Sequence, residues 1–120
     1  MADGHARQRA RRGGRSLTAV LRLGRVLLAV LRLGDSAYAV PVHDEILQCT
    51  GRDVSRGSIY ITLDRLETKG YLRSRLADPT PERGGRSKRY YTLRPRAVDA
   101  LRENRRALVA LWRGLEQQLA

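Results

Sequence analysis

The stretch SRGSIYITLDRLETKGYLRSRL, residues 55–76, has the pattern of a helix that stops at a glycine and runs directly into a strand. Ser55 is a good N-cap, because a serine hydroxyl there can accept a hydrogen bond from a backbone N–H of the first turn. Three apolar residues follow at the i, i+4 and i+7 spacing of a stripe that faces a core: Ile59, Leu63 and Leu66. We therefore predict a helix from Ser55 that Gly70 ends.

The residues after Gly70 have the pattern of a β-hairpin. Residues 71–76 have strand character, with two leucines on one face, Leu72 and Leu76. Residues 77–87 contain two prolines and two glycines, which predicts a loop. Residues 88–93, KRYYTL, form the second predicted strand, with one tyrosine in the core and one outside. Four positive charges lie at or beside the hairpin tip: Arg83, Arg86, Lys88 and Arg89.

Two further helices are predicted upstream. Ser16 is a suitable N-cap for the first of them, and Gly34 ends it. This helix is apolar over much of its circumference, which is typical of a helix that is central to a core or faces a second chain. The second helix lies within residues 38–50. It should begin near Val40 or Pro41, because proline is tolerated only in the first turn of a helix.

The order helix, turn, helix, and hairpin with a basic tip is that of a winged helix-turn-helix. The turn spans residues 51–54 and begins with a glycine that can cap the preceding helix. We therefore predict a mainly α fold with a small β-hairpin (α+β). The expected organisation is a disordered basic arm over 1–15, a winged helix-turn-helix DNA-binding domain over 16–94 and a C-terminal dimerisation helix over 95–120.

The C-terminal segment carries a heptad seam that favours a dimer. Its members step by three and four residues, and one arginine interrupts them: Val98, Leu101, Arg105, Leu108, Trp112, Leu115 and Leu119. Packed against the first helix and a symmetry mate, this seam predicts a homodimer whose interface comprises Leu21, Leu28, Val98, Leu101, Leu108, Trp112, Leu115 and Leu119. The alternative is that the stripe packs back on its own domain. Trp112 could stack on a flat effector, although core packing is favoured.

The composition supports a polyanionic partner. The chain has 120 residues and a formal net charge of +12, carried almost entirely by arginine. Such an excess predicts nucleic acid, although codon bias towards arginine and alanine would also raise it. Cys49 is the only cysteine, so no internal disulfide can form, which favours a reducing compartment and a cytoplasmic location. The arginines that interrupt residues 17–33 argue against both a signal peptide and a membrane span.

The sequence resembles the PadR-like family of bacterial transcriptional regulators, over about Gly24 to Leu101. The resemblance rests on GRDVSRGSIYITLDRLETKGYLRSRL, residues 51–76, and PTPERGGRSKRYYTL, residues 79–93. It implies a homodimeric winged helix that binds operator DNA, is usually a repressor, and in many relatives releases DNA when a small effector binds. Two departures concern helix starts: Tyr38-Ala39 replaces the usual Tyr-Gly, and residues 94–97 lack the usual threonine cap.

The predicted recognition helix begins at Ser55, and its chemistry agrees with DNA binding. Residues near the N-terminus of a helix in the major groove reach base edges, so Arg56 is suited to guanine and Ile61 to a thymine methyl group. Tyr60 is suited to a phosphate, whereas Arg65 could equally pair with an acid. The predicted DNA-binding residues are Ser55, Arg56, Gly57, Ser58, Tyr60, Ile61 and Arg65 on the helix, and Arg83, Gly84, Gly85, Arg86, Lys88 and Arg89 on the wing.

Other function classes have less support in the sequence. His5 lies in the arm and His43 stands alone, and no catalytic or metal-ligating set has motif spacing, so we predict no enzyme, metal or cofactor. The expected partners are double-stranded DNA, a second copy of the chain and a small effector, with no membrane. The rival hypotheses are a winged-helix protein-interaction module and a basic RNA-associated protein. The geometry of duplex RNA argues against an RNA-associated protein, because the deep, narrow major groove of RNA excludes a recognition helix.

Overall fold

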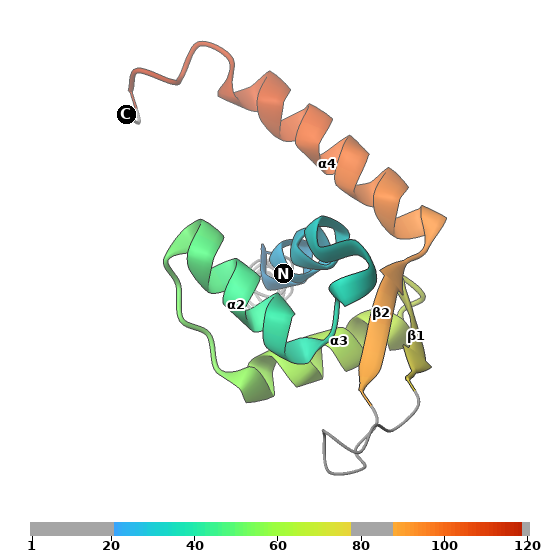
Figure 1. Ribbon diagram of the computed structural model, residues 1–120. Helices are drawn as coiled ribbons and strands as arrows, with labels where there is room; N and C mark the ends of the chain where they lie inside the picture. The colour runs from blue at the N-terminus through green and yellow to red at the C-terminus, as the bar shows by residue number, and fades with distance from the viewer. Residues whose placement is uncertain (1–20, 78–87, 119–120) are drawn as a thin grey trace, which may run out of the picture.

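The computed structural model describes residues 21–77 and 88–118, and Figure 1 shows how their elements are arranged. The winged-helix prediction is confirmed: helices surround a small core, and a two-stranded antiparallel hairpin follows the third helix. Several predictions fall outside the described residues. These are the basic arm over 1–15, the Ser16 cap, Leu119, and the wing residues Arg83, Gly84, Gly85 and Arg86.

The helix-turn-helix is built from the two helices predicted for it. The described part of the N-terminal helix covers residues 21–33 and passes into a short 3₁₀ turn, η1 (Gly34–Ser36). Helix α2 (Ala39–Thr50) begins one residue earlier than predicted, because Pro41 is its third residue and is tolerated throughout the first turn. Gly51 caps it in the left-handed conformation, with φ of 71°, and donates its N–H to the Leu47 carbonyl at 2.8 Å.

Helix α3 (Arg56–Thr68) packs its predicted stripe into the core. Ile59, Leu63 and Leu66 are almost fully buried, together with Thr62, which donates its hydroxyl to the Ser58 carbonyl. Gly70 follows the helix with φ of 84°, as the predicted stop requires. The remaining core comes from all other parts of the domain: Val26, Leu27, Ala29, Val30, Ala37, Ala39, Val42, Ile46, Leu72, Tyr91 and Ala97.

The hairpin pairs β1 (Leu72–Leu76) with β2 (Arg89–Leu93), so that Leu72 lies opposite Leu93 and Leu76 opposite Arg89. The leucine face of β1 is buried only at Leu72, since Leu76 is 59% exposed at the far end of the hairpin. Tyr91 faces the core and Tyr90 does not, as predicted. The backbone N–H of Tyr91 donates to the Ala37 carbonyl at 2.8 Å, which joins the hairpin to the segment after the N-terminal helix.

Helix α4 (Pro95–Trp112) extends from the end of β2 away from the core, as Figure 1 shows. Its N-cap, Arg94, makes no side-chain capping bond, in line with the missing threonine. Beyond Leu101 every described residue of this segment is exposed, so the seam does not pack on its own domain, and Trp112 is not in the core. The helix ends before Leu115, which follows Gly114 at φ of 85° and lies in a turn, so the seam of this helix is shorter than predicted.

Candidate nucleic-acid interface

The N-terminus of α3 is held by the serine that the sequence singled out. Ser55 accepts a hydrogen bond from the Ser58 backbone N–H at 3.1 Å and donates its hydroxyl to the Ser58 hydroxyl at 2.9 Å. Ser58 is half-buried, so its side chain is occupied with capping rather than directed at solvent. The predicted DNA-binding residues of this helix that are exposed beyond the cap are Arg56, Gly57, Tyr60, Ile61 and Arg65.

The exposed face of α3 carries large apolar side chains and a glycine, neither of which is typical of a helix face that contacts only water. Tyr60 is 56% exposed and Ile61 is 62% exposed, although both are large and largely apolar. Gly57 lies on the same face with ordinary helical backbone, and a Cβ added there would meet only the Ser55 hydroxyl, at 4.0 Å. Glycine weakens a helix by about 1 kcal/mol relative to alanine. No contact within the described residues requires glycine at position 57. Because glycine has no side chain, a partner can approach the backbone of α3 closely there.

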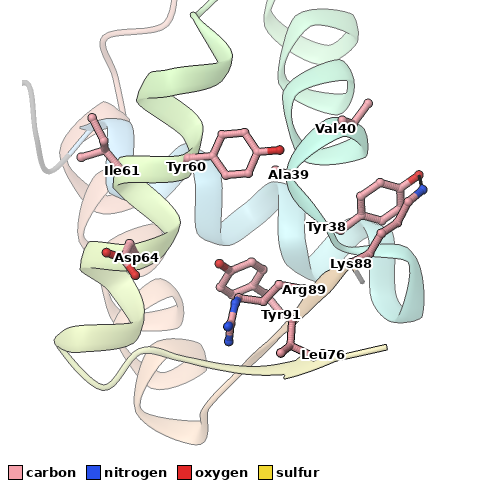
Figure 2. Close-up of a pocket in the computed structure, with 10 residues that line it drawn as sticks. All are labelled: Tyr38, Ala39, Val40, Tyr60, Ile61, Asp64, Leu76, Lys88, Arg89 and Tyr91. Atoms are coloured by element: carbon pink, nitrogen blue, oxygen red, sulfur yellow. Dashed lines mark hydrogen bonds between the residues drawn. The ribbon is translucent and has the colours of Figure 1, made fainter. Parts of the chain in front are cut away.

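A hollow of about 780 Å³ separates α3 from the start of α2 and from β2. Figure 2 shows its two sides: Tyr60, Ile61 and Asp64 project from α3, and Tyr38 and Lys88 lie together on the opposite side. Lys88 donates a hydrogen bond from Nζ to the Tyr38 hydroxyl at 2.9 Å. The lining residues are Tyr38, Ala39, Val40, Tyr60, Ile61, Asp64, Leu76, Lys88, Arg89 and Tyr91.

The two wing cations within the described residues have different surroundings. Lys88 is half-buried against Tyr38, at the mouth of the hollow. Arg89 is exposed but donates from a guanidinium nitrogen to the Ser74 hydroxyl at 2.8 Å, and Ser74 in turn donates to the Glu67 carboxylate. Arg89 is therefore anchored to the corner where α3 meets β1. Both cations remain beside α3, where a bound polyanion would meet them.

Tyr91 forms the floor of the same hollow. It is 7% exposed, and burial raises the pKa of its hydroxyl above the ordinary range.

His43 connects α2 to the turn before α3, a role that the sequence alone did not indicate. Its Nδ1 lies 3.1 Å from an Asp44 carboxylate oxygen, and its Nε2 lies 3.1 Å from an Asp53 carboxylate oxygen. The hydrogen bond with Asp44, and to a lesser degree that with Asp53, raises the pKa of His43 above its ordinary value. The protonated imidazolium can donate to both carboxylates at once and so holds the turn to α2.

A second hollow brings together most of the predicted dimer residues. It has a volume of about 490 Å³ and lies between α4 and the N-terminal helix, with Leu28, Val98, Leu101, Leu108 and Trp112 among its lining residues. Leu28 is 50% exposed and Trp112 is 45% exposed in the single chain. Of the other predicted interface residues, Leu21 and Leu115 are exposed but do not line this groove. The groove is an apolar surface with no covering element among the described residues.

Metal and membrane sites find no support in the part of the chain that the structure describes. No group of three or more His, Cys, Asp or Glu side chains in residues 21–77 and 88–118 is arranged to hold a metal ion. None of the helices in these ranges combines the length and the hydropathy that crossing a membrane would need.

Comparisons with known proteins agree with this geometry. The model of the transcriptional regulator PadR-like family matches residues 27–103. A search of curated proteins finds no match. A proposed transcriptional regulator from Thermoplasma acidophilum superimposes with a TM-score of 0.67 at 17% identity, covering 87% of this chain and 93% of the other.

Two further structures belong to regulators of the matched family. A PadR family transcription regulator from Clostridium difficile has a TM-score of 0.63 at 18% identity, covering 82% of this chain and 98% of its own. A PadR-like regulator from Bacillus cereus has a TM-score of 0.64 at 20% identity, covering 88% and 96%. At these identities the likeness concerns the fold, whereas the family match concerns most of the sequence.

Proposed function

The chain belongs to the PadR-like family of transcriptional regulators, and from this premise we propose that it is a homodimeric repressor of an inverted-repeat operator in double-stranded DNA. As a member of this family it is a transcriptional regulator and not an enzyme. The observation that carries the proposal is the exposed face of α3, where Arg56, Tyr60 and Ile61 project from a capped N-terminus. We place its action in the bacterial cytoplasm, at the nucleoid.

We assign the base contacts to the first turns of α3. Arg56 suits the two acceptors of guanine in the major groove, and Ile61 suits the methyl group of thymine. Tyr60, whose ring borders the hollow beside β2, suits a backbone phosphate. Gly57 lies between them and lets the DNA approach the helix backbone closely.

The groove between α4 and the N-terminal helix supports the proposed dimer. The apolar surface that includes Leu28, Leu108 and Trp112 is too large to stay in water on a monomer, and α4 of a second copy has a complementary apolar seam. A two-fold dimer would present its recognition helices to successive major grooves, about 34 Å apart. A small effector that releases DNA belongs to the same proposal, because the groove beside Trp112 has the volume typical of ligand sites.

Selection of bound genomic fragments by the purified protein tests the proposal. The expected result is enrichment of an inverted repeat, and Arg56→Ala should weaken binding to it by about 1–3 kcal/mol and relax one base position in each half-site. Arg106→Ala is the matched control, because Arg106 is exposed on α4, away from α3, and does not line the dimer groove. Equal weakening on all sequences would make Arg56 a phosphate contact. Preference for RNA over duplex DNA would favour the RNA-associated alternative.

A further inference from the structure

Four arginines from three different elements converge on one flank of α3. Arg22 and Arg25 of the N-terminal helix and Arg52 of the turn line a hollow of about 290 Å³ beside Ser58. Arg22 also lines an adjoining hollow of about 130 Å³, together with Ser58, Ile61 and Arg65 of α3. Because both hollows share Arg22 and Ser58, they form one continuous basic surface, which we call the arginine flank: Arg22, Arg25, Arg52 and Arg65.

The arginine flank has no counter-charge within the described residues. No acidic side chain lines either hollow, and none of the four arginines forms an ion pair in the described ranges. Arg32, on the same N-terminal helix, provides the contrast, because it pairs with Glu45 at 3.0 Å. Arg25 is in addition half-buried. Like charges gathered in this way repel one another, and an anion bound among them would relieve the repulsion.

The position of the arginine flank indicates which anion it would meet. Ile61 borders both the small hollow of the arginine flank and the large hollow that holds Lys88 and Arg89. The exposed ridge of α3 therefore has basic side chains on both sides. A helix in a major groove lies between two sugar-phosphate backbones, one along each side. The arrangement of cations matches those two rows of negative charge.

We propose that Arg22, Arg25 and Arg52 hold DNA backbone phosphates on the side of α3 opposite the hairpin. This inference rests on the proposed entry of α3 into the major groove. It adds the N-terminal helix and the turn to the DNA interface. Two adjoining hollows with four arginines suit a run of consecutive phosphates better than one small anion.

The position of the N-terminal helix in the proposed dimer also indicates where on the operator these phosphates lie. Leu28, on the N-terminal helix, lines the proposed dimer groove, so this helix lies near the two-fold axis of the proposed dimer. The arginine flank would therefore face the centre of the operator, and the hairpin would face its outer ends. The phosphates in question are those between the two half-sites.

A salt titration of operator binding tests the inference with two charge-matched variants of the full chain. The test variant is Arg22→Gln with Arg25→Gln, and the control is Arg32→Gln with Arg106→Gln. Arg32 pairs with Glu45, and Arg106 is exposed on α4 and does not line the dimer groove. Each variant removes two positive charges. The test variant should flatten the slope of log affinity against log salt by about 0.9 for every phosphate that it no longer neutralises, and the control should not. Base preference should stay unchanged, since phosphate contacts carry no sequence information.

Phosphate ethylation interference on the same proteins locates the contacts. In the parent protein, ethylation of the phosphates between the half-sites should block binding. This effect should disappear in the test variant and in Arg52→Gln, which alters the turn alone. An equal slope in test and control variants would overturn the inference, as would interference that persists between the half-sites. Protection of the hollows by inorganic phosphate without any change in DNA slope would show a small-anion site instead. Failure of the parent protein to bind duplex DNA would overturn the proposed function itself, which the other outcomes leave standing.

Discussion

Lys88 donates a hydrogen bond to the Tyr38 hydroxyl at 2.9 Å, and its ammonium nitrogen also lies 4.0 Å from the centroid of the Tyr38 ring. The two residues are far apart in the sequence, and their contact holds a cation at the mouth of the hollow beside α3. A lysine in this position is already ordered before DNA arrives, so less side-chain freedom is lost on binding.

Lys88→Met should flatten the salt dependence of operator binding by about 0.9 in slope, because the variant neutralises one phosphate fewer. Tyr38→Phe keeps the charge and the ring and removes only the hydroxyl, so the slope should stay near that of the parent while affinity falls modestly. Fluorescence anisotropy at several salt concentrations measures both effects. A parent-like slope for Lys88→Met would remove Lys88 from the DNA interface.

Gly57→Ala should have opposite effects on the free protein and on the complex. Alanine is favoured over glycine in a helix by about 1 kcal/mol, and the added Cβ has room in the free chain, so the free energy of unfolding should rise. Operator affinity should fall, because the methyl group separates α3 from the DNA. Thr68→Ala, at the exposed C-terminal end of the same helix, is the control for DNA binding. Unchanged operator affinity in Gly57→Ala would show that DNA does not approach this face closely.

Leu108→Glu should convert a dimer into a monomer. The substitution places a charge in the groove between α4 and the N-terminal helix, where a second copy is proposed to pack. Light scattering should give half the parent mass, and operator affinity should fall with it. Leu111→Glu is the matched control, since Leu111 is exposed on α4 but does not line the groove. A monomeric parent at micromolar concentration would contradict the dimer.

His43 should make the stability of the helix-turn-helix depend on pH. Its folded-state pKa is raised above the ordinary value of 6.5, chiefly by Asp44 and then by Asp53. A raised pKa means that the stabilisation is complete below about pH 6.5 and is lost as pH rises through the folded-state pKa. The free energy of unfolding of the parent, relative to His43→Gln, should therefore decline above about pH 6.5. Urea unfolding on both sides of this pH measures the difference, and parallel pH profiles would contradict it.

The parts of the fold that depend on local chemistry could be predicted from the sequence. The Ser55 cap, the Gly51 stop and the buried stripe of α3 involve residues a few positions apart, so their spacing is enough. The predicted end of α4 lies too far along the chain, because the seam continues in the sequence to Leu119 although the helix stops at Trp112. Hydrophobic periodicity does not reveal where a helix loses its backbone hydrogen bonds.

The parts of the candidate site that depend on tertiary packing could not be predicted. The sequence pattern indicates Arg56, Tyr60 and Ile61, which lie on one exposed face, but not the pairing of Lys88 with Tyr38. It contains no reason to place Arg22 and Arg25 beside Ser58, since that proximity arises only when the N-terminal helix packs across α3. His43 looks isolated in the sequence because one of its two partners, Asp53, lies ten residues further along the chain.

The hydrogen bond from the Tyr91 N–H to the Ala37 carbonyl ties the hairpin to the segment that directly follows the N-terminal helix and η1. Ala37 directly follows η1 and is fully buried, so it offers no hinge between the two. A ligand that rotated the N-terminal helix of one protomer against that of its partner would therefore move α3 and the hairpin of that protomer together. The proposed effector would then release DNA by changing the distance between the two recognition helices of the dimer, while the structure around each recognition helix stays unchanged.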